Sequence, residues 1–171
     1  MKKIAVVLAG CGVQDGSEIH EATITLLAIQ RAGHTYECFA PDKLQYEVVD
    51  HTTDETMNED RNVLTEAARI ARGDILPLDD YDPEDYDALI FPGGNGVAKN
   101  LFTFAVDGID CDIDPLVKQV ILDTYAEGHP IGAICISPLL VVKAFEDMDV
   151  SPTVTLGTVA DMAAAVEVLG G

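Results

Sequence analysis

Basic residues are scarce in this 171-residue chain, which has 10 Lys and Arg against 30 Asp and Glu, for a formal net charge of −20 at pH 7. Proteins bind nucleic acids and anionic membrane surfaces mainly through Lys and Arg side chains. The charge balance therefore argues against both classes of partner. It predicts instead a heavily hydrated acidic surface.

Long apolar runs and the common phosphate-binding motifs are also missing. The apolar run Ile4–Ala9 is far shorter than the roughly 20 residues that a membrane-spanning helix needs. The glycine-rich loop Gly10–Gly16 follows it and contains neither G-x-G-x-x-G nor G-K-[ST], so it does not predict a nucleotide site. We interpret Ile4–Ala9 as a strand that is buried on both faces.

Cysteine is limited to four residues, Cys11, Cys38, Cys111 and Cys135, and their spacing matches no metal motif. In a chain of this size, such usage is typical of a reducing compartment. We therefore expect a cytoplasmic protein without a metal or other cofactor. The aspartates of the segment Val106–Asp114 lack EF-hand spacing, so they predict a solvated loop rather than a calcium site.

Apolar strands and helices alternate along the chain. The predicted strands are Ile4–Ala9, Tyr36–Ala40, Ala88–Phe91, Ile131–Ile134 and Thr153–Gly157. The predicted helices are Glu18–Arg31 (capped by Ser17), Asn62–Ala71, Val97–Phe104, Pro115–Glu127, Pro138–Phe145 and Asp161–Leu169. This alternation predicts one α/β domain over residues 1–171, a three-layer sandwich around a mostly parallel sheet.

One segment, Pro130–Lys143, predicts a strand that turns abruptly into a helix, with Ser137 as its N-cap and Pro138 as its first residue. Cys135 falls on the turn, where a strained backbone pushes the side chain out at the carboxyl end of the sheet. The N–H groups of the helix start favour a thiolate and can stabilise an oxyanion. Cys135 is therefore a candidate nucleophile, and the alternative is a buried core cysteine.

Three loops share that edge of the predicted sheet: Gly10–Gly16, Pro92–Gly96 and the turn at Cys135. Sites in parallel α/β sheets form outside the carboxyl ends of central strands. We therefore expect an active site where these loops meet. Cys11 in the first loop and Asn95 in the second are candidate lining residues.

Several segments together resemble the ElbB family, whose members are called sigma-cross-reacting or enhancing-lycopene-biosynthesis proteins and are described as glyoxalases. These segments are Gly10–Gly12, Asp15–Glu21, Phe39–Lys43, Arg61–Leu64, Glu66–Ile70, Pro92–Gly94 and Ala98–Leu101. The family lies in the PfpI-like, class I glutamine amidotransferase-like superfamily. The resemblance covers essentially the whole chain and implies a flavodoxin-like sandwich with a nucleophile elbow. It also implies a homodimer, and a chain that lacks the family's C-terminal strand and helix.

The resemblance assigns roles to four residues. The elbow cysteine of the family matches Cys135, and its acidic partner on the first helix matches Glu21. The two N–H groups of the oxyanion hole match those of Gly94 and Ile136. Many superfamily hydrolases have His at the position of Ile136, so this chain departs from a Cys-His amidase or protease.

These residues and the resemblance predict a cysteine-dependent, cofactor-independent glyoxalase-like enzyme. It would convert glyoxal or a related reactive dicarbonyl to a hydroxy acid, with protein deglycation as a related activity. A protonated Glu21 beside the sulfur would stabilise the thiolate. Glu18 and His20 are candidates for proton relay; as alternatives, Glu18 is a first-turn acid and His20 points about 100° away from Glu21.

Two other functions remain open at this point. In the first, Cys135 is a redox sensor without turnover, and Cys11, which follows the first strand, lies close enough to pair with it. In the second, the protein is an interaction partner in isoprenoid metabolism, an idea that comes from the family name alone.

Overall fold

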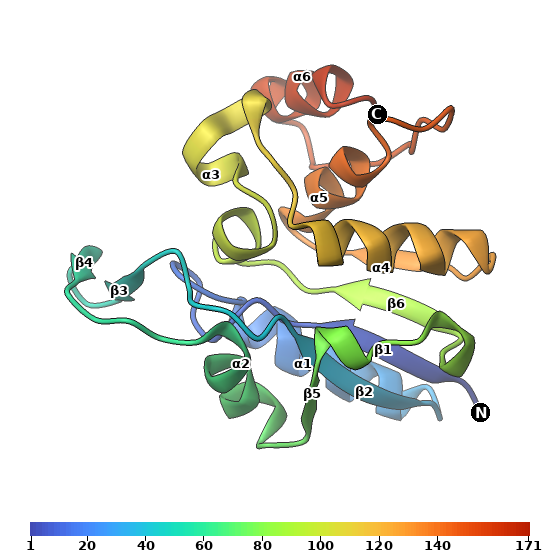
Figure 1. The fold of residues 1–171 in the computed structure, drawn as a ribbon, viewed down its shortest axis with the longest axis horizontal. Helices are drawn as coiled ribbons and strands as arrows, with labels where there is room; N and C mark the ends of the chain where they lie inside the picture. Colours follow the sequence, from blue (N-terminus) through green and yellow to red (C-terminus); the bar gives the residue numbers. More distant parts are fainter.

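The computed structural model describes residues 1–171 and has three layers, with a parallel sheet between two layers of helices (Figure 1). The sheet order is β5-β2-β1-β6-β7, and all neighbouring strands in it are parallel. The strands are β1 (Lys3–Val7), β2 (Thr35–Ala40), β5 (Ile75–Pro77), β6 (Ala88–Phe91) and β7 (Ile131–Ala133). This arrangement confirms the predicted flavodoxin-like α/β sandwich.

Helices cover both faces of the sheet because its central strand is apolar on both sides. Ile4, Val6 and Leu8 pack against α1 (Ile19–Arg31) and α2 (Val63–Ala71). The alternate residues of the same run face the other helical layer, since successive side chains of a strand point to opposite faces. That layer is formed by α4 (Pro115–Ala126), α5 (Ser137–Ala144) and α6 (Ala160–Val168).

Shorter elements complete the chain. An antiparallel hairpin of β3 (Val48–Asp50) and β4 (Glu55–Met57) projects beside the main sheet (Figure 1). The helix predicted over Val97–Phe104 is instead a π-helical turn, Val97–Leu101, followed by the short helix α3 (Phe104–Asp107). The remaining turns are the 3₁₀ segments Leu78–Asp80, Pro83–Asp85 and Gly108–Asp110.

A buried asparagine in the π-helical turn holds the first glycine-rich loop. Asn100 is 3% exposed, and its Nδ2 donates to the carbonyl oxygens of Ala9 (2.9 Å) and Asp15 (3.0 Å). Its Oδ1 accepts the backbone N–H of Tyr46 at 2.8 Å. Each buried polar atom of this amide is therefore satisfied, and the loop is fixed at the carboxyl end of β1.

Thr153–Gly157 is not a strand, although its sequence predicts one. The segment has no regular secondary structure, and no backbone hydrogen bond pairs it with a strand. A β-compatible sequence forms a strand only where a partner backbone lies alongside, and the sheet ends at β7.

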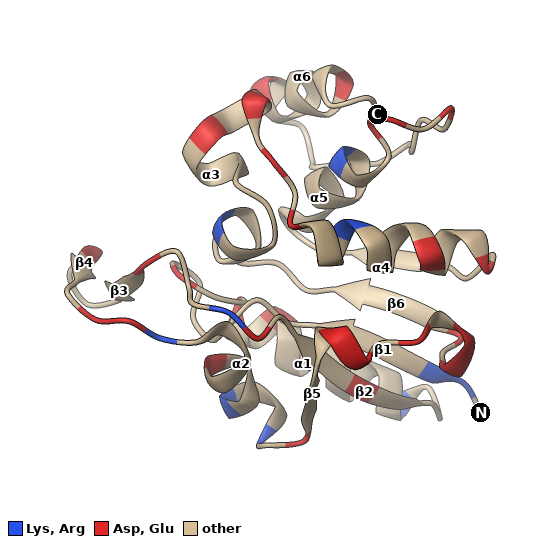
Figure 2. Ribbon diagram, in the orientation of Figure 1, with Lys and Arg blue, Asp and Glu red and all other residues tan.

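Acidic residues are spread over both helical layers and the connecting loops, whereas Lys and Arg are few (Figure 2). Most of the basic side chains pair with a neighbouring carboxylate, such as Lys43 with Asp114 at 2.6 Å. None of the helices combines the length and the apolar character needed to cross a membrane.

Candidate active site

Cys135 lies on the turn between β7 and α5, as predicted. It is exposed and has a φ of 58°, one of three non-glycine residues with positive φ. Positive φ is sterically unfavourable for a residue with a Cβ atom such as cysteine, so surrounding contacts must hold Cys135 in this conformation. The predicted strand-to-helix turn is thus present, with an exposed cysteine at a positive φ.

Hydrogen bonds on both sides of the turn supply that support. Ile134 N–H donates to the Phe91 carbonyl at 3.0 Å, and Ser137 N–H donates to the Ile134 carbonyl at 3.0 Å. The Ser137 hydroxyl donates to the Pro92 carbonyl at 2.8 Å. Ser137 is therefore the first residue of α5 and not its cap, because its side chain joins the elbow to the Pro92–Gly96 loop.

Glu21 and Cys135 both lie against the backbone of Gly93. The Gly93 N–H donates to Glu21 Oε2 at 2.9 Å, and the Gly93 carbonyl accepts the Glu18 N–H at 2.8 Å. A methyl group in place of the Gly93 hydrogen would lie 2.3 Å from Cys135 Cβ and 2.5 Å from Glu21 Oε2. Only glycine lets the carboxyl group and the cysteine pack this closely.

The electrostatics of the thiol differ from the prediction. Partial burial raises the pKa of Cys135 above its ordinary value, and the negative charge of Glu21 raises it further. The N–H groups of Gly94 and Ile136 hydrogen-bond the sulfur and act in the opposite direction. Both donors are where the resemblance implied, but desolvation and a carboxylate outweigh them, so the thiolate is not favoured when Glu21 is charged.

A cleft of about 470 Å³ opens beside Cys135, and no charged side chain lines it. Its lining residues are Asn95, Cys135, Ile136, Thr155, Leu156, Gly157 and Met162. Asn95 was predicted from its loop, and its Nδ2 also donates to Gln14 Oε1 at 3.0 Å. The sequence did not predict that Thr155–Gly157 and Met162 line this cleft, because no local pattern indicates that this C-terminal segment lies next to the Cys135 turn.

Glu18 is the N-cap of α1 and is not among the cleft residues. Its Oε2 accepts the Glu21 N–H at 2.7 Å, and its Oε1 lies 2.8 Å from Nδ1 of His20. The imidazole itself is 86% exposed. Ser17 does not cap the helix, because its Oγ accepts the Ala9 N–H in the core at 2.8 Å. The structure thus favours the first-turn role of Glu18 and places His20 in solvent.

We expect Glu18→Ala to lower the free energy of unfolding by about 1 kcal/mol at pH 7, the usual value of an N-cap. The hydrogen bond from the Glu21 N–H, and after it the hydrogen bond with the His20 side chain, lower the pKa of Glu18 below its ordinary value of 4.5. A carboxyl group whose pKa is lower in the folded than in the unfolded state stabilises the fold at pH values above its unfolded-state pKa. This contribution is lost as the pH falls through the folded-state pKa. Chemical denaturation should therefore show the deficit at pH 7 and its progressive loss as the pH falls below 4.5. An equal deficit in Glu84→Ala, an exposed residue, would contradict the capping role.

Cys11 does not share the surroundings of Cys135. It is half-buried, and the charges that act on its thiol are those of Glu66, Arg69 and Asp15. Burial, Glu66 and Asp15 raise its pKa, and Arg69 lowers it. All four cysteines are free thiols. Cys11 thus faces α2, and the structure does not bring it together with the elbow.

No group of three or more His, Cys, Asp or Glu side chains converges to ligate a metal ion. The uncharged cleft beside Cys135 offers Asn95 and Thr155 as side-chain hydrogen-bonding groups. The arrangement as a whole presents the Cys135 thiol to that cleft, with the Glu21 carboxyl group and the N–H groups of Gly94 and Ile136 next to the sulfur. These are the elements of nucleophilic addition to a carbonyl carbon.

The chain is similar to proteins of a known family. A family model described as the DJ-1/PfpI family matches residues 2–165. The human protein described as glutamine amidotransferase-like class 1 domain-containing protein 3, mitochondrial, is 49% identical over 150 residues, covering 87% of this chain and 56% of that protein. The ES1 protein, mitochondrial, of Danio rerio is 38% identical over 153 residues, covering 86% of this chain and 57% of its own length. The chain therefore spans little more than half the length of these curated relatives.

Solved structures share the fold. A crystal structure from Ehrlichia chaffeensis, described as an isoprenoid biosynthesis protein with amidotransferase-like domain, superposes with a TM-score of 0.92 and 42% sequence identity. The match covers 100% of this chain and 77% of that one.

Proposed function

The chain belongs to the DJ-1/PfpI family, and from this premise we propose that it is a glyoxalase-like enzyme of the ElbB group. It uses Cys135 to convert glyoxal or a related dicarbonyl to a hydroxy acid without a cofactor. One observation carries the proposal: an exposed thiol on a strained turn is faced by the Glu21 carboxyl group and by two N–H donors.

The reaction balances without an oxidant. The sulfur of Cys135 adds to one aldehyde carbon, and the carbonyl oxygen takes a proton to give a hemithioacetal. A base removes the hydrogen from the carbon bonded to sulfur, and a proton returns to the neighbouring carbon, which leaves a thioester with a hydroxymethyl group. Water cleaves the thioester, releasing glycolate and the thiol. The sum is glyoxal plus water to glycolic acid.

Glu21 is the group best placed to move the proton. Its carboxyl group acts on the Cys135 thiol both through its charge and through a side-chain hydrogen bond. Its Oε2 is held by the Gly93 N–H at 2.9 Å, which fixes the orientation of the carboxyl group. The N–H groups of Gly94 and Ile136 face the sulfur and are the donors for the oxyanion of the adduct.

The cleft supports a small, uncharged substrate. It is lined by Asn95, Thr155 and apolar groups, with no Lys or Arg to bind a carboxylate or phosphate. The net charge of −20 also repels anions at low ionic strength. A neutral dicarbonyl enters this site at lower electrostatic cost than a keto acid, and the anionic product leaves it readily.

The direct test is glycolate formation from glyoxal by the protein in the absence of glutathione, followed by mass spectrometry of the Cys135 peptide under turnover. We expect glycolate and an acyl adduct on Cys135, and glycolate formed in D₂O should carry deuterium from the base-mediated transfer. A protein that leaves glyoxal unchanged would overturn the proposal. Oxidation of Cys135 by mild peroxide would then support the redox alternative.

We expect Glu21→Gln to separate thiol reactivity from turnover. The amide keeps the size of the side chain and an acceptor for Gly93, but it carries no charge and cannot take up a proton. Because the charge of Glu21 raises the pKa of Cys135, iodoacetamide should alkylate the variant at least as fast as the wild type. Glyoxal turnover should fall about 100-fold or more, the usual effect of losing a general base. Preserved glyoxal turnover with slow alkylation would show that Glu21 affects only the reactivity of the Cys135 thiol.

One further feature of the proposal is supported by a relative, and two remain predictions from the sequence. The Ehrlichia structure is described as an isoprenoid biosynthesis protein, which supports a link to that metabolism. A homodimer stays a prediction. A cytoplasmic location also stays a prediction; the human and Danio relatives are described as mitochondrial.

A further inference from the structure

Asn95 lines the cleft beside Cys135 and is hydrogen-bonded to the first glycine-rich loop. Its backbone N–H donates to the Val13 carbonyl at 2.8 Å, and its side-chain Nδ2 donates to Gln14 Oε1 at 3.0 Å. An amide side chain has one donor end and one acceptor end. Because Nδ2 is bound to Gln14, the end that remains for a ligand is the acceptor, Oδ1.

The Asp54 carboxylate sets the orientation of the Asn95 amide. Asp54 lies in the turn between β3 and β4, and its Oδ1 accepts from Gln14 Nε2 at 3.2 Å. A carboxylate only accepts hydrogen bonds, so Gln14 presents its NH₂ group to Asp54 and its oxygen to Asn95. Asn95 in turn presents its NH₂ group to Gln14. Both amides therefore take one orientation, because the series of hydrogen bonds begins at a group that cannot donate.

The backbone of Gln14 is fixed as well as its side chain. Its N–H donates to His51 Nε2 at 3.2 Å, and its carbonyl accepts from Lys99 Nζ at 2.7 Å. His51 and Asp54 both belong to the turn of the β3–β4 hairpin, so the hairpin holds the main chain and the side chain of Gln14 together. All of these residues precede α3, and the orientation of the Asn95 amide is therefore independent of the segment from residue 153 onward.

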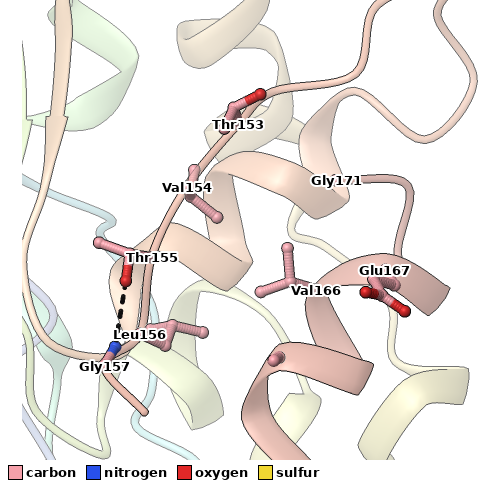
Figure 3. Close-up of a pocket in the computed structure, with 9 residues that line it drawn as sticks. Thr153, Val154, Thr155, Leu156, Gly157, Val166, Glu167 and Gly171 are labelled. Atoms are coloured by element: carbon pink, nitrogen blue, oxygen red, sulfur yellow. Dashed lines mark hydrogen bonds between the residues drawn. The ribbon is translucent and has the colours of Figure 1, made fainter. Parts of the chain in front are cut away.

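The second polar side chain of the cleft imposes no such constraint. The Thr155 hydroxyl accepts the Gly157 N–H at 3.3 Å (Figure 3), and its own proton remains to be donated. A hydroxyl group also rotates to suit its partner. Among the side chains that line the cleft, Asn95 is therefore the one that fixes a hydrogen-bond acceptor.

We propose that Asn95 is a specificity-determining residue, whose Oδ1 accepts the hydroxyl group of the adduct that an aldehyde forms on Cys135. Gln14 and Asp54 are its positioning residues. This proposal rests on the proposed addition of an aldehyde to the thiol. In that step the S–C bond forms, the C=O double bond becomes a single bond, and the oxygen takes up a proton in place of the one that the thiol loses.

The hydrogen bond with Asn95 is made by the adduct and not by the unhydrated aldehyde. A carbonyl oxygen and Asn95 Oδ1 are both acceptors, so the amide does not help the aldehyde to bind. In the adduct, the N–H groups of Gly94 and Ile136 donate to the hydroxyl oxygen while its proton is donated to Asn95. Glu21 is then left to act on the carbon-bound hydrogen. An interaction that appears only as the reaction proceeds favours the adduct over the free aldehyde.

The test measures the adduct without requiring turnover. Propanal forms a hemithioacetal but has no second carbonyl group, so the proposed route cannot convert it to a hydroxy acid. Its adduct should protect Cys135 from iodoacetamide, which mass spectrometry of the Cys135 peptide measures. Asn95→Ala should need about 3- to 10-fold more propanal for half-protection, the usual effect of one hydrogen bond, and kcat/KM for glyoxal should fall by a similar factor. Alkylation without propanal should be unchanged, because it forms no hydroxyl group.

Two further variants test the positioning by Asp54 and Gln14. Asp54→Asn presents either a donor or an acceptor to Gln14, so half-protection should require about two- to threefold more propanal. Asparagine also tolerates the φ of 59° at this position. The double variant, Gln14→Glu with Asp54→Asn, moves the carboxylate next to Asn95 and should restore the wild-type value. Glu55→Gln removes a neighbouring exposed charge and should leave that value unchanged.

The outcomes separate this proposal from the proposed function. Half-protection of Asn95→Ala at the wild-type propanal concentration would overturn the role of Asn95, even if glyoxal gives glycolate. Failure of the double variant to recover would overturn the roles of Gln14 and Asp54. Protection of the wild type without glycolate formation would refute the glyoxalase activity alone, and the Asn95→Ala comparison would still decide the hydrogen bond. If propanal did not protect the wild type, both proposals would be wrong.

Discussion

Replacing Cys135 with alanine is expected to lower kcat/KM for glyoxal by about 10⁴-fold or more, as the loss of a covalent nucleophile does elsewhere. No other thiol can take its place, because Cys38 and Cys111 are buried and Cys11 faces Glu66 and Arg69. Alanine keeps the backbone of an L-residue at the strained φ of 58°, so the free energy of unfolding should change by only about 0.5 kcal/mol. Steady-state glycolate formation and chemical denaturation measure the two effects.

The matched control is Cys11→Ala, which should keep turnover within about twofold of wild type, because its surroundings differ from those of the elbow. Cys135→Ser should also be inactive, since a hydroxyl is far less nucleophilic than a thiol at neutral pH. If Cys135→Ala turned over glyoxal at the wild-type rate, the covalent mechanism would be wrong.

The elements that were predicted well are those specified by neighbouring residues. Asn62 accepts the Thr65 N–H at 3.0 Å and begins α2 where its sequence indicated. Asp114 and Pro115 begin α4 in the same way. The elbow at Cys135 could also be predicted, because an apolar strand, a small-residue turn and a proline-initiated helix follow one another within one short segment.

Two helix N-caps were predicted wrongly because the serine side chain hydrogen-bonds a backbone group outside its helix. Ser17 and Ser137 both have the residue type of an N-cap, yet Ser17 accepts the Ala9 N–H and Ser137 donates to the Pro92 carbonyl. The first hydrogen bond closes the Gly10–Gly16 loop, and the second joins the start of α5 to the Pro92–Gly96 loop. Local propensity cannot reveal such a competitor, because it depends on which loops the fold brings together.

The residues expected at the site lie together around Cys135, whereas the pKa of the thiol differs from the prediction. Glu21, Gly94 and Ile136 all act on the Cys135 thiol, as the resemblance implied. The N–H dipoles that favour a thiolate can be inferred from a strand-to-helix turn, whereas the extent to which the sulfur is removed from water cannot. Desolvation is the largest cause of the raised pKa, and it depends on the packing of the whole cleft.

Gly93→Ala is expected to damage both the fold and the site, although it adds a single methyl group. The new Cβ would lie 2.3 Å from Cys135 Cβ, 2.5 Å from Glu21 Oε2 and 3.0 Å from the Ile134 carbonyl oxygen. The backbone cannot retreat, because the Gly93 N–H and C=O are both hydrogen-bonded to α1 and its cap. We expect the free energy of unfolding to fall by about 2 kcal/mol or more, as for overpacking of a core. Glyoxal turnover should fall about 100-fold or more, because Glu21 and Cys135 are forced apart.

Gly33→Ala is the control that isolates the steric effect. Gly33 has a φ of 78°, and no atom lies within 4 Å of the place that an alanine methyl group would occupy. Alanine there costs about 1 kcal/mol of backbone strain and leaves turnover intact. Gly93 has no positive φ, and its penalty comes from the clash alone. Retained turnover in Gly93→Ala, with Cys135 alkylated at the wild-type rate, would mean that close packing of the cysteine and the carboxyl group is not required. The proton transfer assigned to Glu21 would then need another residue.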